Sequence, residues 1–442
     1  MKKTPYYILF VCLLNASALA ATNSAQKNPT YSDEYITKMW KKIAEIKNQV
    51  AANQPQTASS KPPDAYTLKY TNYNREIKVP PYIKRTSDEN CKAIDNRSPL
   101  LGKPRNQGSV GWCFAYSAAD ALTVKTKEKI SAADIALANY QAVIKQNGGA
   151  NDFNNMPDNK IYKSDYSTGF ELFAIKATNS LGGLCREIDI PSDDHKEAYL
   201  SMAFNSDINS IYRANNLSEA NRISNSLNIK NLLNNIESYK RKNGSSFSMG
   251  ASETPGETAL NRKKREEAVL EEKCEILRET KTAFPSLDLE IILGILIGAQ
   301  NSNDTIDWLQ YYSCKNKRIP LPQNFTIYDI EAENNAKHAI LKNLDEQLDR
   351  GGIAIASYKL ELLPLKNDSN TNEKKKNFGT PNHSSTIVGR RFKNGDCQYL
   401  IRNSWGTSCD YYQDANTNCD NGNVWVSEDA LKTHINYILY FE

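Results

Sequence analysis

A cysteine at the start of an expected helix is the first indication of chemistry in this chain. Residues 106–117 read Asn-Gln-Gly-Ser-Val-Gly-Trp-Cys-Phe-Ala-Tyr-Ser, a glycine-rich loop that runs into a helix expected over 113–128. A thiol at such a helix start feels the positive end of the helix dipole and the unpaired amides of the first turn, and both favour the nucleophilic thiolate. Gln107 could fold back along the loop and donate a hydrogen bond to an oxyanion, beside the Cys113 N–H.

A cysteine nucleophile needs a base, and the base needs a group that orients it. The chain has four histidines. His383 precedes a β-type run of small residues, and Asn403 follows an apolar strand twenty residues later. His338 and His434 are the alternative bases, but neither has a following small-residue strand or a downstream asparagine. The order Gln, Cys, His, Asn therefore predicts a nucleophile, its base and an orienting amide.

These segments resemble those of the papain-like (cathepsin-type) cysteine peptidases. The resemblance rests on Asn-Gln-Gly-Ser, Gly-x-Cys-aromatic-Ala-aromatic-Ser, Asn-His before a small-residue strand, and Asn-Ser-Trp-Gly. It implies that Gln107 is the oxyanion-hole amide, Cys113 the nucleophile, and His383 the general base and acid. It also implies that Asn403 orients the His383 ring and that Trp405 covers the bond between them.

The resemblance further implies a substrate-binding surface, which departs from the family pattern. The expected residues of this surface are Gly111, Trp112, Thr168, Gly169, Asn382 and Trp405. The family signature Cys-Gly-Ser/Ala-Cys-Trp/Tyr is Val-Gly-Trp-Cys-Phe here, so its first cysteine is absent and Trp112 replaces a small residue. Thr168-Gly169 stands where the family has a glycine pair. We expect both changes to narrow the substrate cleft.

The interval from Cys113 to His383 is about twice the ~130–150 residues usual in the family. Residues 192–315 differ in composition from the rest, with densely charged segments of helical pattern. They account for the additional residues between Cys113 and His383. The expected domain is therefore α+β, a papain-like two-lobe fold with a large helical insertion at 192–315. Its helical lobe, 80–191, carries the cysteine, and its β-rich lobe, 316–442, carries the histidine and asparagine.

Hydrophobic periodicity and capping residues predict the elements of the two lobes. Helices are expected over 113–128, 131–146 with a Ser131 cap, and 169–181, the last ended by Gly182-Gly183. Strands are expected over 352–356, 386–388, 399–401, 424–426 and 435–441.

The N-terminal region has the pattern of an exported protein. Residues 1–20 read as a signal peptide, with a charged start, a short apolar run and a small-x-small cleavage site. An extension comes next over 21–79, with a helix expected at 32–50 and a linker at 53–63. This extension is either a propeptide or an amphipathic docking arm. The apolar run 291–299 is flanked by polar residues and predicts a buried helix, so no integral membrane segment is expected.

Composition excludes several function classes. A net charge of +4 is small for 442 residues and gives no case for nucleic acid as a partner. There is no Walker loop, dinucleotide fingerprint or Cys-x-x-Cys, so no cofactor or metal is expected. Of nine cysteines, Cys12 leaves with the signal peptide and Cys113 is the nucleophile. The remaining odd number allows at most three disulfides, of which Cys409–Cys419 is the most local candidate.

The sequence as a whole predicts a periplasmic or extracellular cysteine endopeptidase that acts on proteins or peptides. The extension or the insertion could inhibit it from within the same chain. Two alternatives stay open at this point. One is a non-proteolytic binding protein on the same fold, and the other is an acyl-transfer (transpeptidase-like) enzyme that uses the same site.

Overall fold

The protein is known from a computed structural model. It describes residues 69–70, 84–108, 110–146, 169–193, 199, 276–288, 291–292, 295–296, 302–314, 317–321, 327–331, 337–366, 382–414 and 418–441. The chain divides into two compact units, Met1–Ser59 with Glu197–Ser313, and Ser60–Lys196 with Cys314–Glu442. Most of the predicted insertion falls in the first unit, and its role as an insertion into a peptidase domain stays a prediction.

The second unit combines helices with a largely antiparallel sheet, as the predicted α+β class requires. The strand order is β1-β3-β9-β4-β5-β6-β8-β7, and β2 pairs with β5. Only β1 and β3 pair in parallel among the described strands. The strands are β1 Lys69–Tyr70, β2 Ile94–Asp95, β3 Ile327–Glu331, β4 Ala354–Lys359, β5 Asn382–Lys393, β6 Asp396–Arg402, β7 Cys419–Asp420, β8 Asn423–Ser427 and β9 Ile435–Phe441. The two-lobe arrangement stays a prediction.

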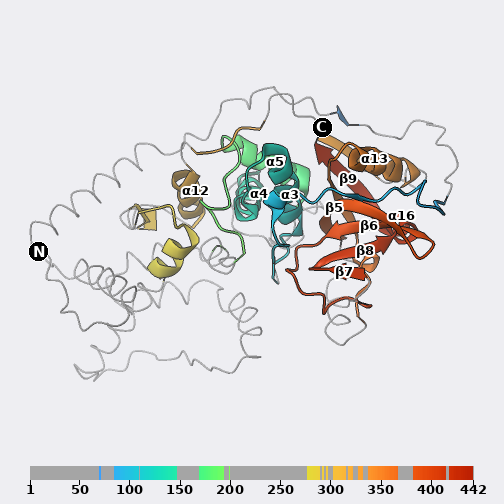
Figure 1. Ribbon diagram of the computed structural model, residues 1–442. Coiled ribbons are helices and arrows are strands. Elements are labelled where there is room, and N and C mark those ends of the chain that lie inside the picture. The colour runs from blue at the N-terminus through green and yellow to red at the C-terminus, as the bar shows by residue number, and fades with distance from the viewer. Residues whose placement is uncertain are drawn as a thin grey trace, which may run out of the picture. The chain divides into compact units, whose positions relative to one another are not determined.

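The predicted helices of the first half are present with small shifts in their bounds. They are α3 Cys113–Thr126, α4 Ala132–Gln146 and α5 Glu171–Ser180. Figure 1 shows them grouped beside the sheet. α3 ends earlier than expected because Lys127 adopts a left-handed conformation (φ 62°) and its N–H bonds the Thr123 carbonyl. The helices described in the second half include α12 Ser302–Cys314, α13 Lys337–Asp349 and α16 Glu428–His434.

The predicted strands are also present, and they are longer than the apolar runs that indicated them. The run 386–388 is the middle of β5, because the small polar residues before it also lie inside the sheet. The strand expected at 352–356 begins only at Ala354 and continues to Lys359. Of the buried helix expected at 291–299, residues 291–292 and 295–296 are described and are helical. Ile292, Ile295 and Leu296 are fully buried.

A serine cap determines where α4 begins, and a glycine permits the turn of the chain after α5. The Ser131 hydroxyl accepts the Asp134 N–H at 2.9 Å, which caps α4. The Asp134 carboxylate pairs with Arg318 at 3.0 Å, and the Ser131 N–H bonds the Cys185 carbonyl at 2.9 Å. After α5, Gly183 has φ +121°, and a Cβ there would lie 2.5 Å from the Ile319 carbonyl oxygen. Only glycine permits this close approach of the two chain segments.

The two faces of β5 pack against different helices. Ser384 and Thr386 reach Ser117 of α3. Ile387 belongs to a buried cluster on the other face, together with α13. The cluster includes Ile340, Leu341, Leu344, Leu348, Tyr358, Tyr399, Ile401, Tyr412 and Val424. The strand that carries His383 is therefore held from both sides.

Three disulfides join described cysteines. Cys409–Cys419 confirms the local prediction, and the others are Cys91–Cys397 and Cys185–Cys314. Among the described residues only Cys113 is a free cysteine. Cys274, the seventh of the cysteines considered for disulfides, lies outside the described residues.

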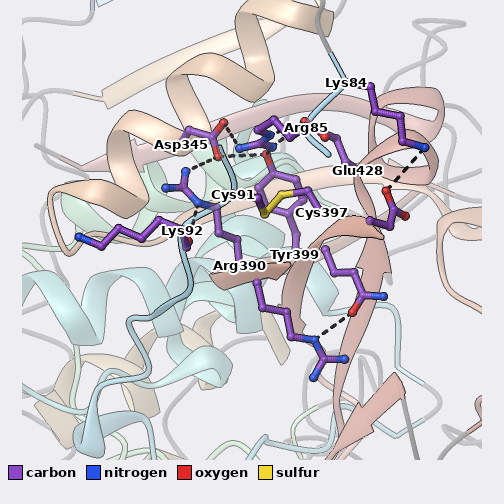
Figure 2. Close-up of a disulfide and its surroundings, with 12 residues drawn as sticks. Lys84, Arg85, Cys91, Lys92, Asp345, Arg390, Cys397, Tyr399 and Glu428 are labelled. Atoms are coloured by element: carbon purple, nitrogen blue, oxygen red, sulfur yellow. Dashed lines mark hydrogen bonds and ion pairs between the residues drawn. A yellow bond between two sulfur atoms is a disulfide. The ribbon is translucent and has the colours of Figure 1, made fainter. Parts of the chain in front are cut away.

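Figure 2 shows the surroundings of Cys91–Cys397. Arg85 pairs with Glu428 at 2.6 Å and with Asp345 at 2.8 Å, and it also bonds the Tyr399 hydroxyl. Arg390 of β5 shares Asp345 at 2.7 Å. The disulfide and these ion pairs fasten the segment before β2 to the sheet and to α13.

No helix among the described residues is long and apolar enough to cross a membrane. The predicted signal peptide, the helix at 32–50 and the linker at 53–63 lie outside the described residues. The predicted extension contributes one described element, β1, which pairs with β3 in the register Lys69↔Tyr328 and Tyr70↔Asp329.

Candidate active site

The antiparallel pairing of β5 and β6 brings His383 and Asn403 together. The register aligns Thr386 with Arg402, so Asn403, the next residue after β6, lies opposite the beginning of β5. On the other side, β4 pairs Tyr358 with His383. His383 is thus the second residue of a central strand, and both it and Asn403 are buried.

A hydrogen bond of 2.8 Å joins His383 Nε2 and Asn403 Oδ1. The same Asn403 oxygen accepts the Ser404 N–H at 2.8 Å, and a backbone N–H can only donate. The atom that faces the imidazole is therefore the carboxamide oxygen, and Nε2 carries the proton. In the neutral ring Nδ1 is then unprotonated and can accept a proton, as a general base must.

Burial lowers the pKa of His383 to about 4, and the hydrogen bond to Asn403 opposes this shift. The imidazole is therefore neutral at neutral pH. Its ring lies 5.2 Å from the Trp405 ring, with a tilt of 40°. The Tyr358 ring approaches edge-on from β4 at 5.6 Å. Two aromatic side chains therefore pack against the imidazole.

The Gln107 loop is joined to the chain just after Asn403. Gln107 N–H donates to the Ser404 carbonyl at 2.8 Å, and Asn106 and Trp405 form an antiparallel bridge. The Ser404 hydroxyl donates to Gln107 Oε1, and Gln107 Nε2 donates to the Val110 carbonyl at 2.7 Å. A primary amide carries two N–H groups, so this arrangement leaves one Nε2 hydrogen for another acceptor.

Cys113 is the first residue of α3, and its sulfur lies beside Ser384, the residue after His383. Trp112, the N-cap, makes no side-chain capping bond, so the first turn keeps amides directed at the helix start. Burial and the Glu171 carboxylate raise the pKa of the Cys113 thiol to about 12. The backbone N–H groups of Ser384, Phe114 and Cys113 lower it, but by less.

This balance corrects one expectation from the sequence. The helix start was expected to favour the thiolate, and its N–H groups do act in that direction. Burial disfavours the charged thiolate more strongly, and Glu171 adds a negative charge nearby. The free site therefore holds a neutral thiol and a neutral imidazole.

The residues expected to line a substrate cleft differ in their exposure to solvent. Gly169 and Asn382 are exposed, and Gly111 is half-buried. A Cβ at Gly169 would lie 2.5 Å from the Phe114 ring, so this glycine is required for packing against α3. Trp112 is only 3% exposed, so little of its indole can touch a substrate, and its narrowing of the cleft stays a prediction. Thr168 lies outside the described residues.

Two residues near the site, Glu171 and Tyr412, were not predicted from the sequence. Glu171, at the start of α5, is buried and hydrogen-bonded to Ser384 and to the Tyr437 hydroxyl. Tyr412 receives the Asn403 amide N–H at 2.8 Å. An acidic residue in the first turn of a helix is a common stabilising feature, so Glu171 gave no functional signal. Tyr412 lies in an irregular segment with no periodic pattern.

One described cluster has the residue types of a metal site. Asp134, Cys185 and Cys314 lie close together and are buried. The two sulfurs form a disulfide, and Asp134 pairs with Arg318. A bonded disulfide has no thiolate to offer, so this cluster is a poor metal ligand set.

Comparisons with known proteins add little to this geometry. No family model matches the sequence, and no curated protein matches it. Among solved structures the chain is similar to digestive procathepsin L 3 of the Tenebrio molitor larval midgut, at 10% identity and a TM-score of 0.34, over 98% of each chain. It is also similar to PepW of Lactobacillus rhamnosis, at 10% identity and a TM-score of 0.36, over 94% of this chain and 93% of that chain. A structure from work on antibody cross reactivity between the mite allergens Blo t 1 and Der p 1 has 12% identity and a TM-score of 0.33, over 85% of this chain and 74% of that chain. Similarities at such low TM-scores say nothing further about this chain.

Proposed function

We propose that this protein is an exported cysteine endopeptidase of the papain-like type, acting on proteins or peptides. The observation that carries the proposal is the 2.8 Å bond between His383 Nε2 and Asn403 Oδ1, with the Cys113 thiol beside Ser384. A neutral imidazole that is held by its Nε2–H and has a basic Nδ1 is what a thiol nucleophile needs for deprotonation. The three disulfides support export, since disulfides persist in oxidising compartments.

In the proposed reaction Cys113 Sγ bonds to the carbonyl carbon of the substrate as its proton passes to His383 Nδ1. The charge that develops on the carbonyl oxygen is stabilised by the second N–H of the Gln107 amide and by the Cys113 N–H. The imidazolium then protonates the leaving amine, and a thioester remains. Water gives a proton to His383 and attacks the thioester, and the thiol recovers that proton as the acid product leaves.

Proton transfer and bond formation are coupled in this mechanism because the resting pair is neutral. A thiol with a pKa raised to about 12 is a weak nucleophile until His383 takes its proton. Asn403 stabilises the imidazolium that forms, since its oxygen accepts the Nε2–H in both protonation states. Trp405 keeps water from competing for that bond.

The direct test is labelling with a peptidyl epoxide or vinyl sulfone, followed by peptide mapping. We expect the label on Cys113, and we expect Cys113→Ala and His383→Ala to abolish peptide hydrolysis. Gln107→Ala is expected to lower turnover on the order of 10²-fold, as for one lost oxyanion donor. Cys274→Ser is the matched control, because it removes a cysteine that takes no part in the three disulfides between described residues, and it is expected to keep both label and activity.

Undiminished hydrolysis by Cys113→Ala would overturn the proposal. Product analysis with an added amine separates it from the alternatives. Free acid as the main product supports hydrolysis, whereas a new amide would identify an acyl-transfer enzyme. A folded wild-type protein that neither takes the label nor cleaves peptides would favour the binding protein.

A further inference from the structure

The Asn403 carboxamide is held at both ends. Its Oδ1 faces His383 Nε2 at 2.8 Å and also accepts the Ser404 N–H and, at 3.2 Å, the Ser385 hydroxyl. Its Nδ2 donates to the Tyr412 hydroxyl oxygen at 2.8 Å. The amide nitrogen of Asn403 is thus held by its hydrogen bond to Tyr412, while the amide oxygen faces His383.

Tyr412 comes from a segment that is itself firmly anchored. The Cys409–Cys419 disulfide closes this segment, and the Tyr412 N–H bonds the Cys409 carbonyl at 3.1 Å. Tyr412 forms an antiparallel bridge with Leu365, and the next residue, Gln413, donates to the Pro364 carbonyl at 2.7 Å. The phenol is therefore presented to Asn403 by covalent and backbone constraints.

The surroundings of the Tyr412 side chain favour a neutral, well-placed phenol. The side chain is 1% exposed, and its ring stacks on Trp405 with an interplanar angle of 10° and a centroid distance of 6.4 Å. Burial raises the pKa of Tyr412 to about 12, and the hydrogen bond from Asn403 opposes this shift. The phenol thus stays protonated over the pH range in which an imidazole acts as a base.

We infer that Tyr412 is a positioning residue for the His383–Asn403 pair, which it serves by accepting the Asn403 Nδ2–H and keeping the carboxamide oxygen directed at the imidazole. The inference rests on the proposed function for its catalytic consequence. Without the phenol oxygen a buried N–H loses its acceptor, which is costly, and the amide gains from rotating to find another. Rotation weakens the Nε2–H bond and lets the ring protonate on Nδ1, the nitrogen that must stay basic.

A second phenol acts on the opposite end of the same amide and offers a comparison within the site. The Tyr358 hydroxyl donates to Ser385 Oγ at 2.8 Å, and Ser385 donates to Asn403 Oδ1. The Tyr358 hydroxyl acts on Asn403 through Ser385. If that hydroxyl were removed, Asn403 Oδ1 would still accept the Ser404 N–H. The Tyr358 hydroxyl is therefore expected to matter less for the orientation of the amide than that of Tyr412.

The test is Tyr412→Phe, with Tyr411→Phe as the matched control. Tyr411 is the adjacent residue, is 50% exposed, and also has its ring near Trp405, at 6.1 Å. We expect Tyr412→Phe to lower kcat for peptide hydrolysis about tenfold, with KM within about twofold, as for one buried hydrogen bond. Tyr411→Phe is expected to match the wild type.

An NMR readout is independent of peptidase activity. The ¹⁵N shifts of the His383 ring are expected to show the Nε2–H tautomer in the wild type and in Tyr411→Phe. In Tyr412→Phe they should show a mixture that includes Nδ1–H. If the wild type does not cleave peptides, the tautomer still tests the positioning role, so a failure of the inference can be told from a failure of the proposed function.

A double-mutant cycle separates positioning from general destabilisation. In an Asn403→Ala background, Tyr412→Phe should cause no further loss of kcat, because the amide that it positions is absent. Should Tyr412→Phe fail to fold, 3-fluorotyrosine at position 412 keeps the ring and weakens the acceptor, and a smaller loss of kcat is expected. A single Nε2–H tautomer with unchanged kcat in Tyr412→Phe, or full additivity in the cycle, would overturn the inference.

Discussion

At the scale of single residues, a buried carboxylate opposes thiolate formation at Cys113. Glu171 is buried, and burial raises its own pKa, while hydrogen bonds from Ser384 and Tyr437 act in the opposite direction. When ionised, it adds a negative charge near a sulfur that must itself become negative during attack. Together with burial, it keeps the pKa of Cys113 near 12. Glu171 therefore favours the resting thiol over the thiolate.

Glu171→Gln is expected to lower the pKa of the Cys113 thiol, because a like charge is removed while the side-chain size is kept. The rate of Cys113 alkylation by iodoacetamide, measured against pH, should rise at a lower pH than in the wild type. Glu361→Gln, an exposed substitution of the same kind, serves as the control and should leave the profile unchanged. An unshifted profile in Glu171→Gln, or one shifted to higher pH, would contradict this account.

At the scale of elements, one carboxylate joins the two chain segments that carry the site to α3. Asp120 of α3 accepts Arg402 Nε at 2.9 Å and Arg105 Nη2 at 2.7 Å. Arg402 immediately precedes Asn403, and Arg105 lies two residues before Gln107. Despite its burial, the pKa of Asp120 is lowered, because both guanidinium groups stabilise its charge. The network ties the orienting amide and the Gln107 loop to the helix that begins at Cys113.

Asp120→Asn is expected to destabilise the protein by about 3–5 kcal/mol, because Arg402 loses its buried counter-charge. Arg105 keeps Glu187, at 3.1 Å. The control is Asp95→Asn, which breaks the Asp95–Arg97 ion pair where the aspartate side chain is 48% exposed, and should cost at most about 1 kcal/mol. Urea unfolding at neutral pH measures both. Equal, small losses in the two variants would show that the buried network contributes little to stability.

At the scale of the whole molecule, two disulfides close loops of very different length. Cys185 and Cys314 are 129 residues apart, and the segment Glu197–Ser313 of the first unit lies between them. Cys409 and Cys419 are only 10 residues apart. A cross-link that closes a longer loop removes more conformational entropy from the unfolded chain. The Cys185–Cys314 bond should therefore contribute more to stability.

Replacing Cys185 and Cys314 together by alanine is expected to cost roughly 5 kcal/mol, against roughly 3 kcal/mol for the Cys409 and Cys419 pair. Denaturant unfolding without reductant measures each double variant against the wild type. A larger loss on removing the short-loop disulfide would contradict the entropic argument. In that case local contacts of the segment that carries Tyr412 would be the main source of the stability.

The sequence by itself determined the features that depend on short-range pattern. Local periodicity and loop residues predicted the helix start at Cys113, the strand at 386–388 and the strand that ends before Asn403, although β5 begins earlier, at Asn382. The resemblance of the sequence motifs implied the contact between His383 and Asn403, and the antiparallel pairing of β5 and β6 accounts for the bond. The Cys409–Cys419 disulfide could also be predicted from the sequence, because only 10 residues separate the two cysteines.

Only the tertiary structure decided the features that depend on groups distant in the chain. The pKa of Cys113 rises because packing partly buries the thiol and because α5 brings Glu171 to α3, and neither effect is visible in residues 106–117. The long-range disulfide Cys91–Cys397 depends on how the segment before β2 lies on the sheet. Tyr412 reaches Asn403 from an irregular segment whose path is set by backbone bonds to Pro364 and Leu365. Local patterns encode which elements form, whereas the energies of buried charges and hydrogen bonds depend on the neighbours that packing supplies.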